Sequence, residues 1–358
     1  MALSPSLRSE TIFGMVLCIE VGFTLMLHPR LRGSYYEMGV KYGGVLAKHG
    51  FKLPQVDEET LALGMKCEEE VRSVFPEILD EVRGLAEAIH EPYGRAAAFI
   101  LTVGYGKPMG CSSFASVNDS RVFFGRNYDF YYRFGKSSES YLTRPKGAYA
   151  SLGNTDVLLG REDGVNEHGL AISMHFVSAQ LGTPGISFPV AVRYVLDKCR
   201  ETGEAVDFLS HVKFLTANNY LVADKSGEVA VVEVCPAATQ VRRPENGERF
   251  IAATNHFVHP EMKRFEDVSK RDPDSETRYS TILRSLREVR GGVTGSIAKR
   301  ILSSHEGRVC SHMDYVKLGT LWSQIVELQR LTILRAEGQP CKTEYRSDKR
   351  LQVSMKND

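Results

Sequence analysis

Hydrophobic positions follow two different spacings along this chain, and the spacing changes near residue 110. Residues 35–48, YYEMGVKYGGVLAK, place apolar side chains at the spacing of a helix, and a helical pattern continues over residues 57–90 until Pro92 marks a stop. From residue 111 onward the apolar residues occur in short runs separated by turn-forming Asn, Asp, Ser and Gly. The pattern therefore predicts helices first and strands after them.

The runs after residue 110 predict a series of strands with helices between them. The predicted strands are CSSFASV, RVFFGRNYDF, GLAISMHFV, NNYLVAD and EVAVVEVC, and a last pair falls at about 318–335. PVAVRYVLDKC and EAVDFLSHVKFL predict one or two helices, and later helices are predicted over 276–290 and 294–303. This order fits an α+β layered sandwich better than regular βαβ winding, and residues 1–358 are expected to form one domain.

Composition and charge narrow the class of protein. The 358 residues are 42% hydrophobic and 25% charged, as in soluble globular proteins. The 45 Lys and Arg residues nearly balance the 44 Asp and Glu residues, so the formal net charge is +1. Because neither a strong field nor a basic cluster attracts polyanions, we expect no nucleic acid and no membrane among the partners.

Residues 11–27, TIFGMVLCIEVGFTLML, are the most apolar run of the chain. They are too short, and too clearly interrupted by Glu20, to predict a membrane-spanning helix. An export signal is one interpretation, but no A-x-A cleavage site follows the run. We favour a first core strand and a cytoplasmic protein.

Cysteine and histidine spacing favours neither disulfides nor metal. An odd number of dispersed cysteines without a CxxC pair argues against a disulfide framework and a structural zinc site; they are Cys18, Cys67, Cys111, Cys199, Cys235, Cys310 and Cys341. Several histidines are expected at surface or turn positions, namely His168, His256, His259, His305 and His312. We therefore expect no metal and no cofactor, and six of the cysteines to be small buried hydrophobes.

The remaining cysteine follows a glycine, an arrangement that suits self-cleavage. The thiol of Cys111 can attack the carbonyl carbon of Gly110, where a glycine offers little steric obstruction. Hydrolysis of the resulting thioester frees an α-amino group on Cys111. Because such an amine has a pKa of about 7.7–8.0, it can act as the base for its own side chain. Gly110 and Cys111 are thus the candidate cleavage pair.

The residues after Cys111 predict a hairpin that strengthens this interpretation. CSSFASVNDSRVFFGRNYDF reads as a strand, an Asn-Asp-Ser turn and a returning strand. The returning strand brings Arg126, Asn127 and Asp129 beside Cys111. A carboxylate there can hold the ammonium or the thiol, and a guanidinium can order the site or bind a substrate carboxylate. An exposed strand ion pair is the alternative for Arg126 and Asp129.

With these residues the chain resembles the cysteine N-terminal-nucleophile (Ntn) hydrolases of the choloylglycine hydrolase and penicillin V acylase type. It looks closest to the branch of the isopenicillin N acyltransferases. The motifs that carry the resemblance are GCSSFASVNDSRVFFGRNYDF, DGVNEHGLAIS, LVADKSGEVAVVE and ATNHF, in this order along the chain. The resemblance implies a four-layer αββα sandwich, with two mainly antiparallel sheets between helical layers.

The resemblance also implies roles for individual residues. Cys111 matches the nucleophile and new chain start, Asp129 the aspartate near its amine, and Asn255 in ATNHF an oxyanion-hole donor. Arg126 matches an arginine of the bile-salt and penicillin V enzymes, and Arg278 in SETRYST a late family arginine. A turn-forming asparagine and a helix-surface arginine are the alternatives for Asn255 and Arg278.

One departure from the family pattern concerns the second oxyanion donor. After NEHGLAIS, related hydrolases carry an asparagine, whereas this chain has His175 in SMHFV. A neutral imidazole can donate a hydrogen bond in its place, and simple packing is the alternative. His175 and Arg278 therefore enter as candidate oxyanion or substrate residues.

The sequence thus predicts a self-processing enzyme for linear, non-peptide amide bonds, working through a Cys111 thioester. Segment 1–110 is expected to become one chain and 111–358 the other, in a homo-oligomer of two-chain protomers. Small amides or acyl donors, acyl-coenzyme A among them, are the expected substrates. The alternatives are an uncut binding protein that keeps the fold, and a papain-like cysteine hydrolase, whose local signatures are missing.

Overall fold

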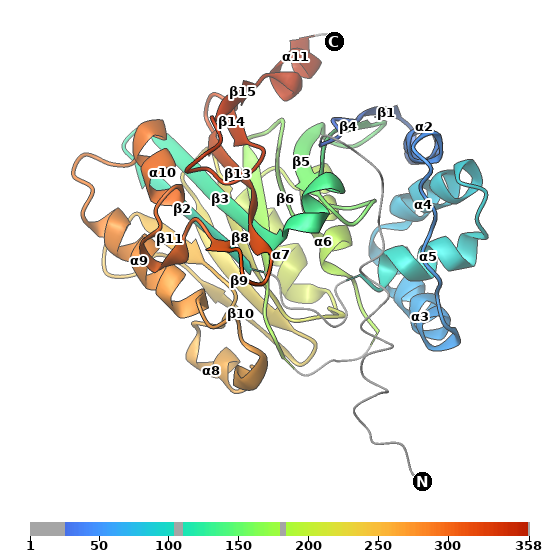
Figure 1. The fold of residues 1–358 in the computed structure, drawn as a ribbon, viewed down its shortest axis with the longest axis horizontal. Helices are drawn as coiled ribbons and strands as arrows, with labels where there is room; N and C mark the ends of the chain where they lie inside the picture. The colour runs from blue at the N-terminus through green and yellow to red at the C-terminus, as the bar shows by residue number, and fades with distance from the viewer. Residues whose placement is uncertain (1–25, 104–109, 180–183, 357–358) are drawn as a thin grey trace.

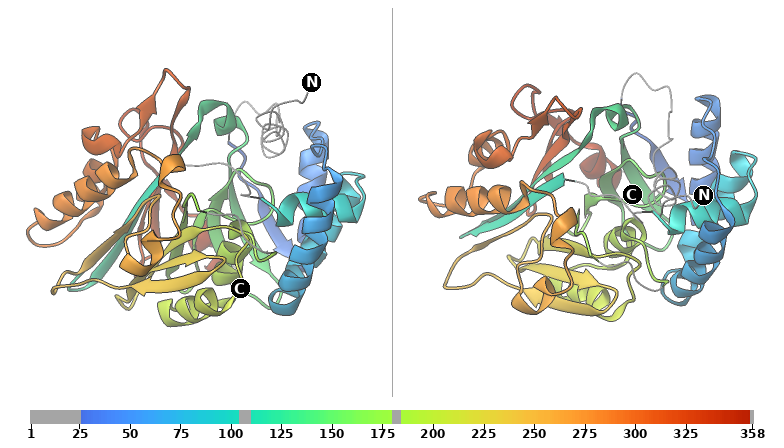
Figure 2. Two further views of the ribbon diagram at one scale, coloured as in Figure 1. Left: turned by 90° about the horizontal axis from the view of Figure 1, so that it is seen from below. Right: turned by 60° about the horizontal axis from the view of Figure 1, so that its bottom comes forward.

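Two β-sheets lie face to face between layers of helices in the computed structural model, which describes residues 26–103, 110–179 and 184–356 (Figures 1 and 2). The first sheet has the order β1-β4-β5-β6-β7-β8-β9-β10. Its strands are β1 (Arg30–Gly33), β4 (Glu139–Pro145), β5 (Ser151–Thr155), β6 (Asp163–Asn166), β7 (Leu170–Phe176), β8 (Asn218–Asp224), β9 (Val229–Cys235) and β10 (Ala238–Arg242). The β1–β4 pair is parallel and the other pairs are antiparallel.

The second sheet carries the Gly110–Cys111 pair on one of its inner strands. Its order is β11-β2-β3-β13-β14-β15, with β12 beside β13. The strands are β2 (Gly110–Asn118), β3 (Arg121–Tyr131), β11 (Phe250–Ala253), β12 (His312–Met313), β13 (Leu318–Glu327), β14 (Thr332–Ala336) and β15 (Arg346–Asp348). All of its pairs are antiparallel.

Helices cover the outer face of each sheet. α6 (Phe188–Lys198) and α7 (Thr202–His211) pack on the first sheet, and α9 (Ser275–Arg287) and α10 (Gly295–Leu302) pack on the second. Between the sheets the core is built from buried apolar side chains of both, such as Phe124, Leu221 and Val231. The layer order is therefore αββα, as the resemblance implied.

A group of helices from the first part of the chain lies at the β1 edge of the first sheet (Figure 1). It consists of α2 (Tyr35–Lys48), α3 (Glu58–Val74), α4 (Pro76–Ala88) and α5 (Tyr93–Leu101). Ser34 and Glu37 form a capping box that starts α2, and the Asp57 side chain caps α3. A Cβ on Gly39 would lie 2.0 Å from the carbonyl oxygen of Glu81, so only glycine allows α2 and α4 to pack this closely.

Short elements complete the description. They are α8 (Pro260–Lys263), α11 (Arg350–Lys356) and the 3₁₀ turns η1 (Tyr132–Lys136), η2 (Val268–Lys270) and η3 (Glu306–Arg308). η3 is followed by the loop that leads into β12.

The predicted elements agree with the structure where the periodicity is strong. The helix at 35–48 and the five strand runs are confirmed. The pattern over 57–90 is two helices, because Pro76 is well placed only in the first turn of a new helix. α5, beyond Pro92, was missed, and so were β5 and β6, whose Gly, Asn and Asp residues have low strand propensity. The strand expected in 11–27 lies mostly outside the described residues.

A buried ion-pair cluster ties the early helices to the first sheet's own helical layer. Arg193 on α6 contacts Glu81 on α4 at 3.0 Å and Asp197 at 2.8 Å. The Tyr35 hydroxyl on α2 also donates to Asp197, at 2.9 Å. All three charged side chains are fully buried. The contacts therefore join residues on either side of the Gly110–Cys111 bond.

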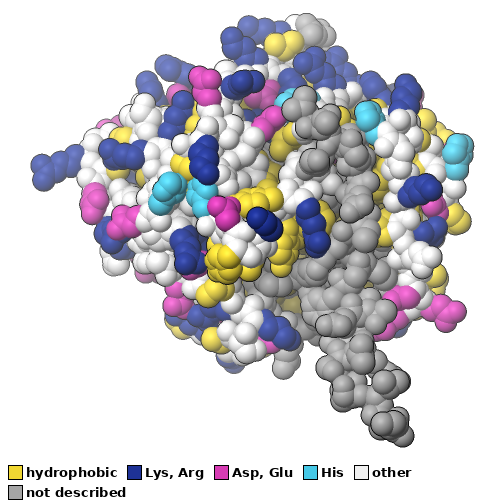
Figure 3. Space-filling model, in the orientation of Figure 1, with side chains coloured by type: hydrophobic (Ala, Val, Ile, Leu, Met, Phe, Trp, Pro, Cys, Tyr) yellow, Lys and Arg dark blue, Asp and Glu magenta, His cyan; other side chains and the backbone are white. Residues whose placement is uncertain are grey.

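The surface carries both signs of charge. On the face in Figure 3, basic and acidic side chains are interspersed, and Lys and Arg gather along the upper edge, where β14, β15 and α11 lie. None of the helices within the described ranges is long and apolar enough to cross a membrane.

Candidate active site

The predicted hairpin places Cys111 on an inner strand of the second sheet. β2 and β3 pair with Gly110 opposite Asp129, Cys111 opposite Tyr128 and Ser113 opposite Arg126. Opposite residues of antiparallel strands point to the same face, and neighbours along a strand alternate. Cys111 and Arg126 therefore face the space between the sheets, while Asp129 faces the α9–α10 layer.

On the inner face, Arg126 lies beside the thiol. Its Nη2 donates to Cys111 Sγ at 3.4 Å, and its Nη1 donates to the Met174 carbonyl at 2.6 Å. Its Nε lies 2.8 Å from Asp163 Oδ2 in an ion pair that is completely buried. The guanidinium is thus fixed from β7 and β6 while it faces the sulfur, and it is not the exposed strand residue of the alternative interpretation.

A tryptophan completes this inner face. Trp322 on β13 stacks on Tyr128 with ring centroids 3.9 Å apart, and its indole N–H donates to Asp163 at 3.0 Å. The same carboxylate therefore holds both the guanidinium of Arg126 and the indole. Because both donors fix Asp163, the guanidinium has little freedom to leave the thiol.

On the outer face, Asp129 lies against Gly110. Its Oδ1 accepts a hydrogen bond of 2.6 Å from Thr320, and its Oδ2 has no hydrogen-bond partner among the described residues. A Cβ added to Gly110 would lie 3.0 Å from the Asp129 Cβ and 3.4 Å from Oδ2. Burial raises the pKa of Asp129 to about 6, although Arg278 and Thr320 oppose that rise. The carboxylate therefore lies beside the Gly110–Cys111 bond, which the sequence predicts to be cleaved.

Asn255 and Arg278 meet at the main chain of Cys111. The Cys111 N–H donates to Asn255 Oδ1 at 2.7 Å, and Arg278 Nη2 donates to the same oxygen at 2.8 Å. Asn255 Nδ2 donates to the Phe176 carbonyl at 3.0 Å. In this arrangement the asparagine faces the nitrogen that cleavage would turn into an amine. Its role as an oxyanion donor stays a prediction.

Arg278 itself is held at the start of α9 by two further contacts. Its Nε donates to Ser112 Oγ at 2.9 Å, and Nη2 contacts Asp272 at 2.6 Å. The side chain is buried rather than on the helix surface. The nearby carboxylates of Asp272 and Asp129 raise its pKa against the effect of burial. Arg278 thus supplies a permanent positive charge next to Asn255.

His175 on β7 contacts the nucleophile strand β2 through Ser113. Its Nδ1 donates to the Asn219 carbonyl at 3.1 Å on the neighbouring strand β8, so its Nε2 is left as the acceptor, 2.8 Å from the Ser113 hydroxyl. Burial, together with Arg126, holds the pKa of the imidazole well below its usual range. With both ring nitrogens engaged, the geometry favours packing over oxyanion donation.

Electrostatics keep the thiol protonated in the continuous chain. Cys111 is completely buried, and burial raises its pKa to about 12 against the opposing effect of Arg126. Attack by this sulfur therefore requires a nearby group that accepts its proton. A new α-amine on Cys111 would provide that group.

Several contacts of the site were not predicted from the sequence. Thr320 lies far along the chain from Asp129, whereas Asp272 lies only six residues before Arg278, and no pattern marks either residue. Asp163 belongs to the motif DGVNEHGLAIS, so the motif was a signal for it, although no role was assigned to it. The site thus depends on positioning residues that only the fold brings to the hairpin.

A comparison with protein-family models places this chain in a family. The model of the acyl-coenzyme A:6-aminopenicillanic acid acyl-transferase family matches residues 116–342. That range includes Arg126, Asp129, Asn255 and Arg278, and it begins just after Cys111. A search of curated protein sequences gives no match.

Solved structures with this fold include amide-hydrolysing enzymes. A conjugated bile acid hydrolase from Clostridium perfringens is similar with a TM-score of 0.50 and 14% identity, over 66% of this chain and 92% of that chain. An N-acylethanolamine-hydrolyzing acid amidase ortholog from Caenorhabditis elegans gives 0.46 and 19%, over 60% and 92%. Penicillin V acylase from Agrobacterium tumefaciens gives 0.44 and 18%, over 63% and 83%. The chain has the αββα sandwich of the Ntn hydrolases, and it belongs to the acyl-coenzyme A:6-aminopenicillanic acid acyl-transferase family.

Proposed function

We propose that this chain cuts itself between Gly110 and Cys111, and that the product breaks linear, non-peptide amide bonds through a thioester on Cys111. The observation that carries the proposal is the set of groups around this one peptide bond. Asp129 lies against Gly110, Asn255 accepts from the Cys111 nitrogen, and Arg126 faces the sulfur. Arg126 and Asp129 come from opposite faces of β3 and Asn255 from the segment after β11, and each side chain is buried.

The proposed cleavage is an N-to-S acyl shift followed by hydrolysis. Cys111 Sγ bonds to the carbonyl carbon of Gly110, the C–N bond breaks, and the thiol proton ends on the departing nitrogen. Water then splits the thioester, which leaves a carboxylate on Gly110 and a free thiol on Cys111. In this step Asn255 Oδ1, which accepts from the Cys111 nitrogen, and Asp129, whose Oδ2 has no hydrogen-bond partner within the described part of the chain, would hold the new ammonium.

Turnover repeats the same chemistry on a substrate. The freed amine of Cys111 takes the thiol proton, and the sulfur attacks the acyl carbon of the amide. The amine part of the substrate leaves with that proton. Water then completes a hydrolysis, whereas an acceptor amine completes an acyl transfer. Acyl-coenzyme A, itself a thioester, can acylate the same sulfur in the transfer reaction.

Trapping the acyl-enzyme tests the proposal. The processed protein is incubated with a panel of N-acyl amides in the presence of hydroxylamine, and separately with acyl-coenzyme A plus an amine in its absence. A thioester intermediate releases an acyl hydroxamate, and Cys111→Ala releases none. Equal turnover by Cys111→Ala would refute the thioester mechanism. Amide formed from acyl-coenzyme A identifies a transferase, whereas carboxylic acid and amine released from the N-acyl amides without amide synthesis identify a hydrolase.

An uncut binding protein is the alternative, and the same panel addresses it. Such a protein would retain the Gly110–Cys111 bond and bind a ligand without converting it. The buried ion pairs and the engaged side chains around Cys111 are consistent with a precursor, and they give this alternative no separate support.

A further inference from the structure

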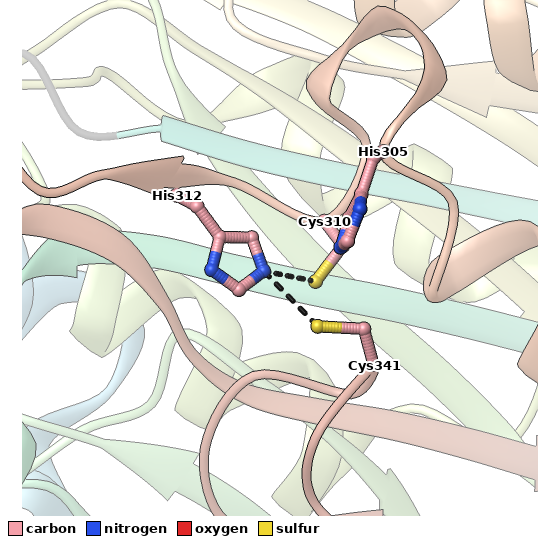
Figure 4. Close-up of side chains that lie close together, drawn as sticks. All are labelled: His305, Cys310, His312 and Cys341. Atoms are coloured by element: carbon pink, nitrogen blue, oxygen red, sulfur yellow. Dashed lines mark hydrogen bonds between the residues drawn. The ribbon is translucent and has the colours of Figure 1, made fainter.

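Two cysteines and two histidines meet at one point outside the candidate active site. His305 follows α10, Cys310 and His312 flank the start of β12, and Cys341 lies on the loop between β14 and β15. Their ligand atoms all lie within 4.8 Å of one another. His312 Nε2 is 3.3 Å from Cys310 Sγ and 3.1 Å from Cys341 Sγ. Figure 4 shows both sulfur atoms directed toward the His312 ring, with His305 beside Cys310.

These distances suit a tetrahedral zinc ion. Zinc binds sulfur at about 2.3 Å and nitrogen at about 2.0–2.1 Å, so the ligand atoms of a tetrahedral site lie roughly 3.3–3.8 Å apart. The closest pairs of the cluster are already near that separation, and the others need to approach by about 1 Å. We propose that His305, Cys310, His312 and Cys341 bind one zinc ion.

The ligand set indicates a structural site. Four protein ligands close the tetrahedron and leave no position for water or substrate, unlike catalytic zinc with its open position. Two thiolates also balance the charge of the ion, and binding releases their protons to solvent. The mixture of burial fits this role: Cys310 is buried, His312 and Cys341 are half-buried, and His305 is exposed, which leaves a path for the ion.

The spacing of cysteines and histidines along the chain predicted no metal. The first three ligands lie within eight residues, but Cys341 lies 29 residues after His312 and reaches it only through the β13–β14 hairpin. The four residues are therefore brought together only by the fold. Cys310 is buried as expected, whereas Cys341 is only half-buried.

A zinc ion at this site would fix the loop that supports Asp129. Next to Cys310, the Ser311 N–H donates to Thr320 Oγ1 at 3.0 Å, and Thr320 donates to Asp129 at 2.6 Å. On the other side of Cys310, the Val309 carbonyl accepts from Asn127 at 2.8 Å. The ion would join this loop to the Cys341 loop. It would thereby stabilise the face of the β2–β3 hairpin on which Asp129 lies.

Metal analysis of the full-length protein tests the inference. The protein is purified on a metal-free affinity resin and analysed by mass spectrometry of its metals, with about one zinc per chain expected. Cys341→Ser and His312→Gln should each weaken zinc affinity by more than the roughly 10–100-fold that losing a hydrogen-bond partner of a zinc ligand costs. Cys235→Ser and His211→Gln, which remove the same side-chain types elsewhere, should retain the ion.

Two further measurements use the unmodified protein, so they test the zinc site even if a variant fails to fold. Replacement by Co²⁺ in the unmodified protein should give the visible absorption of a tetrahedral thiolate site. A thiol reagent should release zinc in proportion to the cysteines modified. Absence of bound zinc from protein prepared in zinc-supplemented medium would overturn the proposal. A Cys310–Cys341 disulfide, detected as a loss of two hydrogens in the non-reduced mass, would overturn it equally. None of these readouts depends on self-cleavage or on amide turnover.

Discussion

At the residue scale, the structure shows a second reason for a glycine at position 110, in addition to its place directly before Cys111. In the sequence, a glycine at this position leaves the carbonyl carbon accessible to the thiol of Cys111. In the fold, a Cβ added to residue 110 would also lie 3.0 Å from the Cβ of Asp129. A contact at that distance is closer than ordinary van der Waals separation, so Asp129 would have to move. The glycine therefore keeps the carboxylate against the bond.

Replacement of Asn255 tests its role at the site. Asn255→Ala should fold and should lower turnover by about 10²–10³, the usual effect of removing an oxyanion donor. Asn255→Asp separates two roles, because it keeps an acceptor for the Cys111 nitrogen but has no amide N–H. Steady-state kinetics of both variants are compared with circular dichroism. Activity of the alanine variant within threefold of the unmodified enzyme would exclude a catalytic role.

Asp129 should make self-cleavage depend on pH. Its pKa is raised to about 6, and only the ionised carboxylate can hold a developing ammonium. Above pH 6 the group is ionised, so the cleavage rate should be level there and fall about tenfold per pH unit below it. Precursor refolded from urea at a series of pH values gives this profile by gel densitometry.

The Asp129→Asn variant is the matched control for that profile. It keeps the shape and the contact to Thr320 but carries no charge. It should cleave slowly at all pH values, without the acid limb and with unchanged secondary structure. A variant that is fully processed and fully active would show that the carboxylate has no part in the reaction.

Some residues of the site could be predicted from the sequence, and others could not. Arg126 and Asp129 were predictable because a short hairpin leaves few ways to pair β2 with β3. Asn255 and Arg278 were predictable only through motifs shared with a family. Thr320 was not, since it follows from the pairing of β13 with β3, where the register shifts between Thr320 and Trp322. Such an irregularity has no signature in the apolar pattern.

At the scale of elements, the contact between α4 and α6 determines how the two segments hold together. Arg193 is buried between Glu81 and Asp197, so its removal leaves two buried carboxylates without their closest cation. Loss of one partner from a buried ion pair costs about 3–5 kcal/mol. Arg193→Met should therefore lower the free energy of unfolding by that amount, measured by urea denaturation in a Cys111→Ala background that remains one chain.

An exposed ion pair on α3 is the control for that measurement. Arg72 contacts Glu68 one turn away, and its side chain is 58% exposed. Solvent-exposed pairs contribute about 0–1 kcal/mol, so Arg72→Met should change stability little. Equal losses in the two variants would indicate that the cost at Arg193 comes from losing a long side chain and not from the buried charges.

At the scale of the whole molecule, the αββα layers explain why a cut chain would stay assembled. The early helices and α6 share one hydrophobic cluster, which contains Met38, Leu85 and Val192 among many others. β2 and β3 remain inner strands of the second sheet whether or not Gly110 is bonded to Cys111. Segments 1–110 and 111–358 should therefore co-elute in size-exclusion chromatography and separate only under denaturing conditions.

The mass of each chain in the purified protein, with N-terminal sequencing, tests the central claim directly. Self-cleavage between Gly110 and Cys111 predicts two chains of roughly 12 and 28 kDa from the 39.9 kDa precursor, the larger beginning at Cys111. Cys111→Ala should remain a single chain, and Cys111→Ser should be cut slowly, because a hydroxyl is a weaker nucleophile than a thiol near neutral pH. A full-length protein that turns over an amide substrate, or a cut at any other bond, would contradict the account.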